Sequence, residues 1–274
     1  MTIVAIAGDA TTTTAVAVAA GWPPEQGGGD DVIVLEADPG GGSLTGWLDT
    51  PTQPSLATIV ANAGIDADRD HRSVLDTVRV MTRRSDAGIR FIANAVRARV
   101  AFRAVEEAAL VVVPALAAAA TVVLADVGST RVGQPPSPAL RAADVVVVVH
   151  RQAAASAAAA TVRVERLVET VEDLAHLDAT VVLAVSGRSP FDPAAIGQFV
   201  GDAVPGTLRH TVALADDPLA AATIAGRSGV SAKRLRRLPL MRDAARLAAE
   251  LADIVASAPD TGARERSGAE EASA

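Results

Sequence analysis

The chain has 274 residues, enough to bury a large core, and half of them are hydrophobic although only 2% are aromatic. It contains no cysteine, which excludes disulfides, thiolate metal sites and cysteine catalysis. The formal net charge of −7 argues against broad nonspecific binding of nucleic acid but is compatible with a local basic patch.

The N-terminal stretch has the order strand, tight turn, helix. Residues Thr2–Ala7 are apolar, a turn covers Gly8–Thr11, and the helix Thr12–Ala20 opens on threonines. This order aims backbone N–H groups and the positive end of the helix dipole at the turn, as in a phosphate-binding site.

The turn lacks the chemistry of a P-loop, which would place glycines at Ala5 and Ala10 and a lysine at Thr11. Only Thr12 keeps its residue type. Lys233 is the only lysine in the chain, so no lysine near the N-terminus is available to a phosphate.

The rest of the chain alternates between apolar runs and helical patterns. Further strands are predicted at Val32–Glu36, Gly88–Ala93, Ala120–Ala125, Asp144–His150, Thr180–Ser186 and Thr207–Leu214. Further helices are predicted at Pro54–Ala63, Ser73–Met81, Val100–Leu116, Ala153–Ala175, Asp192–Gly201, Asp217–Ala225 and Leu240–Ala256. Asp192 is the predicted N-cap of its helix, and Pro193 its first residue.

One run, Ala108–Ala125, reaches the length of a membrane span. It is rich in alanine and contains Pro114, so we interpret it as a buried helix followed by a strand, and membrane insertion is not expected. The N-terminus has no basic region typical of a secretory signal, and the predicted location is the cytoplasm.

This alternation predicts an α/β fold: one doubly wound, mainly parallel sheet of about seven or eight strands with helices on both faces, similar to P-loop NTPases. Residues 1–256 form this domain, and the acidic tail 257–274 is expected to be disordered. Ligands bind at the carboxyl ends of strands in such sheets. Asp9, Asp38 and Asp126 each follow a strand and are expected to meet at this edge.

Several segments resemble the ParA/MinD family of P-loop ATPases, which includes the atypical CpaE/TadZ proteins of pilus assembly. IAGDATTTTAVAVAA is similar to the family's phosphate loop in register from Thr12, and VIVLEADPGGGSLTGWLD to its second-strand motif. VVLADVGS resembles its Walker B strand, and DDPLAAATIAG the segment after its last strand. The resemblance covers residues 1–256 and implies a magnesium-dependent ATPase fold and a homodimer.

The resemblance also implies roles for single residues. The nucleotide contacts would be Gly8, Thr11, Thr12 and Thr13. Magnesium would be held by Thr12, Asp38 and Asp126, and Asp38 would also activate water. Glu36 replaces the first aspartate of the second-strand motif.

Other positions depart from the family pattern. Ile6 stands at the signature lysine and Thr11 at the phosphate lysine, while Ser186 replaces the asparagine that recognises the base. Since phosphoryl transfer depends on positioning and charge stabilisation, these losses predict little catalysis.

Structural interpretations remain beside the functional ones. Asp9, Thr11 and Thr12 are typical helix-capping residues. A sharper hypothesis has the Asp9 carboxylate at the anion position of the helix N-terminus, which locks the fold without nucleotide. Asp38 and Asp126 are either inherited loop residues or a retained magnesium shell with Thr12.

One basic cluster, Lys233, Arg234, Arg236 and Arg237, is either a solvated loop or a surface for an anionic partner, DNA or protein. The final helix, Leu240–Ala256, has an apolar stripe but an acidic, mixed polar face. This pattern indicates a helix packed on the core rather than a membrane anchor.

The leading hypothesis is a noncatalytic ParA/MinD-like scaffold or spatial organiser, acting in cell division, chromosome partitioning, or pilus or secretion assembly. It needs no cofactor and forms a homodimer, and it also binds a protein partner of unknown identity. It lies in the cytoplasm, or peripherally at a pole or division site. The alternatives are a weak ATPase that uses ATP and magnesium, and a DNA-associated segregation protein.

Overall fold

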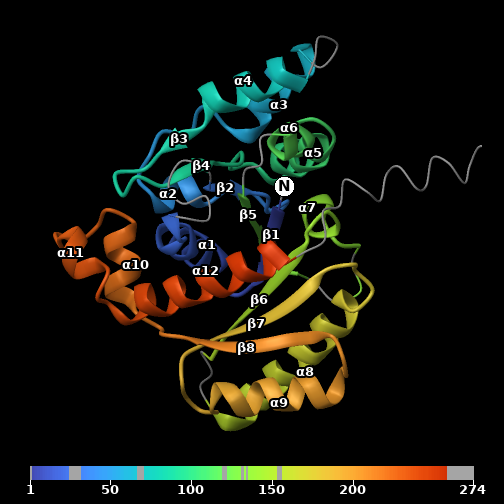
Figure 1. The fold of residues 1–274 in the computed structure, drawn as a ribbon, viewed down its shortest axis with the longest axis vertical. Coiled ribbons are helices and arrows are strands. Elements are labelled where there is room, and N and C mark those ends of the chain that lie inside the picture. Colours follow the sequence, from blue (N-terminus) through green and yellow to red (C-terminus); the bar gives the residue numbers. More distant parts are fainter. Residues whose placement is uncertain are drawn as a thin grey trace, which may run out of the picture.

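Eight strands form one sheet in the computed structural model, which describes residues 2–24, 32–66, 71–118, 122–130, 133, 135–152 and 156–257 (Figure 1). The strands are β1 (Thr2–Gly8), β2 (Val32–Glu36), β3 (Arg83–Arg84), β4 (Arg90–Ile92), β5 (Val122–Gly128), β6 (Val145–Arg151), β7 (Thr180–Ser186) and β8 (Leu208–Leu214). Their order is β3-β4-β2-β5-β1-β6-β7-β8, and all neighbouring pairs are parallel except β3 with β4. The predicted sheet is confirmed.

The central strands are buried on both faces, which explains their near-continuous valine content. In β6, Val145–Val149 are all buried, as is typical of β-branched residues in a parallel sheet covered on both sides. Alternate residues of each strand face opposite layers. Val146 and Val148 belong to one hydrophobic core, and Val147 and Val149 belong to the other.

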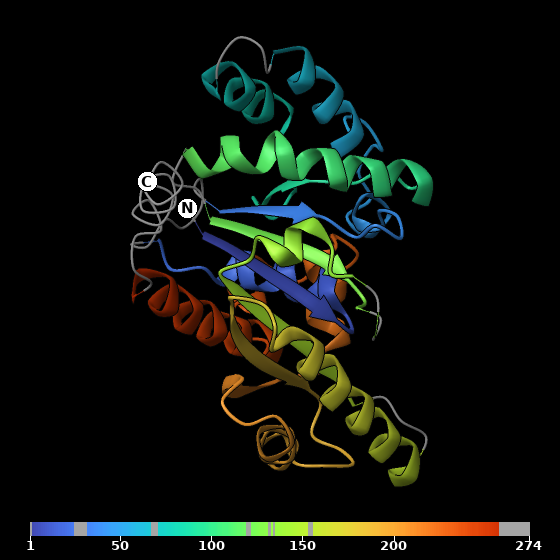
Figure 2. The same ribbon diagram turned by 90° about the vertical axis from the view of Figure 1, so that its right-hand side faces the viewer.

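Helices form a layer on each face of the sheet (Figure 1, Figure 2). One layer contains α3 (Leu56–Asp66), α4 (His71–Met81), α5 (Ala98–Leu110), α6 (Val112–Ala118), α7 (Pro138–Arg141), α8 (Ala157–Leu174) and α9 (Pro193–Ala203). The other contains α1 (Thr11–Gly21), α2 (Leu44–Trp47), α10 (Pro218–Ile224) and α12 (Pro239–Ser257), with α11 (Ala232–Leu235) between the last two. In Figure 2 the arrowheads of the central strands point to one side, which is therefore the carboxyl edge.

The final helix packs on the core, as predicted. Helix α12 buries Leu247 and Leu251 and lies so close to α1 that a Cβ on Gly21 would come within 2.8 Å of the Ala245 Cα. Small residues on both helices permit this approach.

One predicted element was wrong, and several short elements were not predicted. The helix expected at Val100–Leu116 is two helices, broken at Val111. Pro114 cannot donate to a preceding carbonyl, so it ends the first helix and is accommodated in the first turn of α6. The short strand β3 and helices α2, α7 and α11 were not predicted, because two to four residues are too few for a periodic signal.

Other predictions hold. The run Ala108–Ala125 contains the end of α5, then α6 and the start of β5, and within the described part of the chain no helix has the length and apolarity to cross a bilayer. Asp192 caps α9 by accepting from the Ala194 N–H at 2.8 Å. Residues 258–274, in the predicted tail, and 153–155, at the start of a predicted helix, lie outside the described residues.

Candidate functional site

The turn between β1 and α1 keeps the frame of a phosphate loop. Gly8 is the last residue of β1 and has a φ of 106°, so the strand leads directly into the turn. Ala10 takes the left-handed φ of 50°, where glycine is usual, and is the N-cap of α1. No side chain caps the helix, so the predicted capping by Asp9, Thr11 or Thr12 is wrong.

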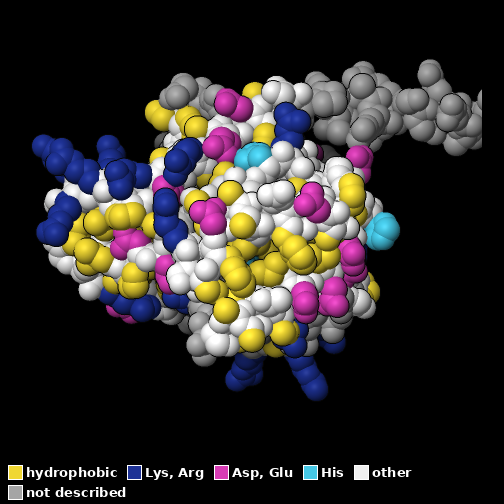
Figure 3. Space-filling model, turned by 90° about the horizontal axis from the view of Figure 1, so that it is seen from below, with side chains coloured by type: hydrophobic (Ala, Val, Ile, Leu, Met, Phe, Trp, Pro, Cys, Tyr) yellow, Lys and Arg dark blue, Asp and Glu magenta, His cyan; other side chains and the backbone are white. Residues whose placement is uncertain are grey.

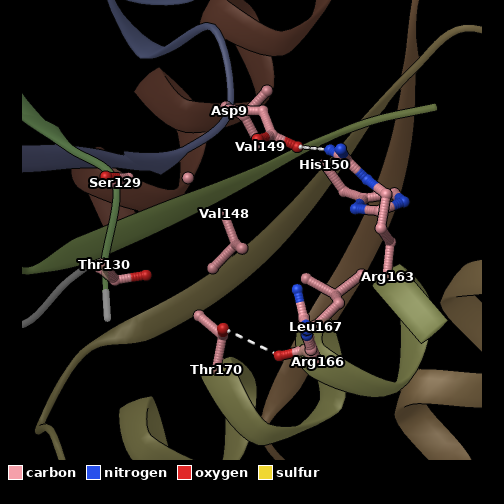
Figure 4. Close-up of a pocket in the computed structure, with 11 residues that line it drawn as sticks. Asp9, Ser129, Thr130, Val148, Val149, His150, Arg163, Arg166, Leu167 and Thr170 are labelled. Atoms are coloured by element: carbon pink, nitrogen blue, oxygen red, sulfur yellow. Dashed lines mark hydrogen bonds and ion pairs between the residues drawn. The ribbon is translucent and has the colours of Figure 1, made fainter. Parts of the chain in front are cut away.

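The Asp9 carboxylate points away from α1. Its Oδ2 accepts from a guanidinium N–H of Arg163 on α8 at 2.6 Å and from the backbone N–H of Arg151 at 3.1 Å (Figure 4). The hypothesis that Asp9 occupies the anion position of the helix N-terminus is therefore wrong. The long arginine side chain reaches the carboxylate and draws it to the opposite face of the sheet.

Thr12 and Asp126 meet as the parallel topology predicts, because β1 and β5 are neighbours and end at the same edge. The Thr12 hydroxyl donates to Asp126 Oδ2 at 2.5 Å, and the Gly128 N–H donates to Oδ1 at 3.2 Å. Asp126 is only 2% exposed. Burial raises the pKa of its carboxyl, and the hydroxyls of Thr11 and Thr12 and the Gly128 N–H oppose that rise.

Asp38 lies beside this pair. A Cβ on Gly128 would come within 2.3 Å of Asp38 Oδ2, so glycine is needed where the two segments meet. The carboxylate accepts from the Gly40 N–H at 2.7 Å. Burial and, to a smaller extent, the charge of Asp126 raise the pKa of Asp38.

The third acidic side chain of this group is Glu36 rather than Asp9. Glu36 is 1% exposed and accepts from the N–H groups of Ser43 (2.6 Å), Leu44 (2.7 Å) and Asn94 (2.8 Å). Burial raises the pKa of Glu36 despite these hydrogen bonds, and Asp126 adds to the rise. The edge thus holds three carboxyls, Glu36, Asp38 and Asp126, each more easily protonated than in water.

The remaining predicted residues lie in different surroundings. Thr11 is 6% exposed, so it presents little surface to a ligand, whereas Thr13 lines a cavity of about 330 Å³ together with Ser186 and Asp217. Arg151 lines the same cavity, and its guanidinium binds both carboxylate oxygens of Asp216 at 3.0 and 3.1 Å.

The basic cluster Lys233, Arg234, Arg236 and Arg237 is exposed. None of its side chains forms an ion pair with the described part of the chain. Figure 3 shows Lys and Arg side chains gathered around the end of the molecule that carries α10 and α11.

The parallel sheet, the turn before α1 and the aspartate at the end of the neighbouring strand define a P-loop NTPase-like fold. No protein-family model matches the sequence, and no curated protein matches it. Solved structures do match in three dimensions.

A ParA family ATPase from Chlorobium tepidum TLS superposes with a TM-score of 0.62 at 14% identity, over 90% of this chain and 98% of that one. The septum site-determining protein MinD from Pyrococcus horikoshii OT3, solved with Mg-ADP, gives 0.58 at 17% identity over 91% and 95%. The cell division ATPase MinD from Pyrococcus furiosus gives 0.58 at 16% identity over 91% and 99%. The chain therefore has the fold of the ParA and MinD ATPases.

The residues of the turn fit a magnesium-bound triphosphate poorly. At Thr11 the turn carries a hydroxyl in place of a lysine, and the negative charge of Asp9 is balanced by Arg163. Both arginines that contact Asp9, Arg151 and Arg163, are already paired with carboxylates of the chain. Among the described residues, no group of three or more His, Asp or Glu side chains is arranged to hold a metal ion. The magnesium role predicted for Thr12, Asp38 and Asp126 remains a prediction.

The three carboxyls predict an unusual dependence of stability on pH. Their pKa values are raised in the folded protein, so the folded state binds protons more tightly than the unfolded chain. Their contribution to the free energy of unfolding is therefore largest at low pH and falls as pH rises above about 4, the unfolded pKa.

Asp126→Asn should remove part of this effect, since the amide oxygen can still accept from the Gly128 N–H and the amide N–H groups can donate to the hydroxyls of Thr11 and Thr12 after these rotate. In chelator-containing buffer we expect the variant to gain stability at neutral pH, with each unit of pKa elevation removed corresponding to about 1.4 kcal/mol. Urea unfolding at several pH values checks this. A difference between variant and parent that stays constant from about pH 4 to pH 7 would contradict it.

Proposed function

We propose that this chain is a ParA/MinD-like protein, of the CpaE/TadZ type, whose nucleotide site is degenerate and which acts as a noncatalytic scaffold or spatial organiser. The observation that carries the proposal is Thr11 at the lysine position of a turn that has no lysine, while Arg163 is already bound to the Asp9 carboxylate at 2.6 Å. Without a cation at this position, the charge of a triphosphate is not offset.

The kind of organising role is proposed from the neighbours. Their titles name septum-site determination, cell division and the ParA family. Cell division, chromosome partitioning, and pilus or secretion assembly all use proteins placed at a pole or division site. We propose that the chain works at such a place as a homodimer, and that this homodimer binds a different protein.

Calorimetric titration of the full chain with Mg-ATP and Mg-ADP tests the proposal, and we expect no micromolar binding by the native protein. The matched variant Asp9→Gly/Ala10→Gly/Thr11→Lys restores the loop and should gain affinity for ATP. Sedimentation should give the same dimer with and without Mg-ATP.

Micromolar binding of ATP by the native chain would contradict this proposal and would favour the alternative hypothesis that the chain is a weak ATPase. If nucleotide does not bind, retention of duplex DNA that weakens steeply with salt and is lost in Arg236→Gln/Arg237→Gln would favour the DNA-associated segregation protein. The exposed basic cluster is the observation that keeps this second candidate.

A further inference from the structure

A second polar cavity, of about 250 Å³, lies on the face of the sheet opposite α1 (Figure 4). It opens between the carboxyl ends of β1, β5 and β6 and the helix α8, and we call it the α8 pocket. Its polar lining is Asp9, Ser129, Thr130, His150, Arg163, Arg166 and Thr170. No residue of α1 lines it, although Gly8 and Asp9 of the turn before α1 do, so the pocket lies behind the turn rather than at the helix N-terminus.

His150 is the buried polar group of the α8 pocket. The side chain is 6% exposed, and neither ring nitrogen forms a hydrogen bond with any residue in the described ranges. Neither ring nitrogen is among the described buried atoms that lack a partner, so the ring nitrogens reach the cavity, where a polar ligand can bind them. Burial lowers the pKa of His150, which favours the neutral ring with one N–H to donate, and the charge of Asp9 opposes this effect.

Two arginines of α8, three residues apart, supply the positive charge. Arg163 binds Asp9, but its Nε is buried and has no hydrogen-bond partner among the described residues. Arg166 is exposed, and its guanidinium forms no ion pair within the described residues. Two guanidinium groups against the single carboxylate of Asp9 leave the pocket with a net positive charge.

The remaining donors come from the loop after β5. Figure 4 shows Thr130 across the cavity from Arg163 and His150, with Arg166 and Thr170 on the helix between them. The Thr170 hydroxyl donates to the Arg166 carbonyl at 3.0 Å, so it can only accept from a ligand. N–H and O–H donors thus come from a strand, a helix and a loop.

We propose that the α8 pocket binds a phosphate group, free or as a monoester, through Arg166, His150 and the hydroxyl of Thr130, with Arg163 shared between the ligand and Asp9. Donors on three sides suit a tetrahedral anion better than a planar carboxylate, and guanidinium groups match phosphate oxygens bidentately. The site does not depend on the proposed function, since none of the donors named for the ligand is a predicted nucleotide contact, although Gly8 and Asp9 of the turn line the pocket.

Titration of the full chain with inorganic phosphate and, separately, with phosphoserine tests the proposal by calorimetry and by NMR of the His150 ring. We expect saturable binding at millimolar concentration or below and a shift of the His150 signals. Arg166→Gln, on the surface, should weaken binding at least about tenfold, the loss of one charge-assisted partner. Arg103→Gln, an exposed arginine of α5 remote from the α8 pocket, is the matched control and should bind as the native chain does.

Binding of either probe with loss in Arg166→Gln supports the site, and tighter binding of phosphoserine identifies a monoester as the ligand. Three results overturn it: no shift of His150, equal weakening in both arginine variants, or equal binding of acetate, which would indicate a general ionic effect.

Discussion

Replacing Gly8 with alanine is expected to destabilise the protein by about 3 kcal/mol or more. Gly8 has a φ of 106°, and a Cβ there would lie 2.4 Å from the carbonyl oxygen of Val149. That oxygen is part of β6 and accepts from the Asp9 N–H at 2.8 Å, so it cannot move without opening the junction of β1 and β6. Urea unfolding followed by circular dichroism measures the loss.

Gly206→Ala is the matched control. Gly206 also has a positive φ, of 80°, but nothing lies within 4 Å of its Cβ position. Its loss should be only that of the left-handed backbone, about 1 to 2 kcal/mol. If Gly8→Ala and Gly206→Ala lower the free energy of unfolding by the same amount, the contact with Val149 adds nothing to the cost of the positive φ. Close packing against β6 would then not be the reason for glycine at position 8.

The sheet could be predicted because its signal is local. Runs such as Val32–Glu36 and Thr180–Ser186 are continuous stretches of apolar residues, and their bounds are the ones the structure has. The edge strand Arg83–Arg84 has no such run, since it is short, polar and paired on one side only. The inner strands could be predicted because burial on two faces requires a continuous apolar sequence, which strand propensity alone does not.

Part of the site followed from the same topology. Thr12 follows the turn after β1, and Asp126 lies near the end of the neighbouring parallel strand β5, so their contact needed only the strand assignments. The Asp9–Arg163 pair could not be predicted, because its partners are 154 residues apart and no periodicity marks Arg163 as facing the turn.

His150 was missed for a different reason. It follows a run of five valines and looks like the last residue of a buried strand, and it is the last buried residue of β6, which ends at the exposed Arg151. That its ring lines a cavity depends on the surrounding α8 and the loop after β5, which the sequence does not position.

The second large effect is expected at Glu36, which holds the glycine-rich loop. Oε1 accepts from the N–H groups of Ser43 and Leu44, at the start of α2, and Oε2 accepts from the Asn94 N–H after β4. Gly42 packs closely against Glu36 and Asn94, since a Cβ on Gly42 would lie 2.7 Å from Glu36 Oε2 and 2.6 Å from the Asn94 carbonyl oxygen. One carboxylate therefore joins β2, α2 and the segment after β4.

Glu36→Ala would leave these three N–H groups without their acceptor, and the hydrogen bonds of two of them, Leu44 and Asn94, are buried. At about 1 to 3 kcal/mol for each unsatisfied buried group, we expect a loss of about 3 kcal/mol or more in the free energy of unfolding. Amide hydrogen exchange of Ser43, Leu44 and Asn94 should speed up together, because one side chain protects all three.

Glu36→Gln separates hydrogen bonding from charge. The amide oxygen can still accept from Ser43 and Leu44, and the variant removes a carboxylate whose pKa is raised by burial, so the two changes partly offset each other. We expect it to lose clearly less stability than Glu36→Ala and to leave the exchange of Ser43 and Leu44 slow, with only Asn94 accelerated. Equal losses in the two variants would show that the negative charge, and not the shape of the acceptor, holds the loop against the strands.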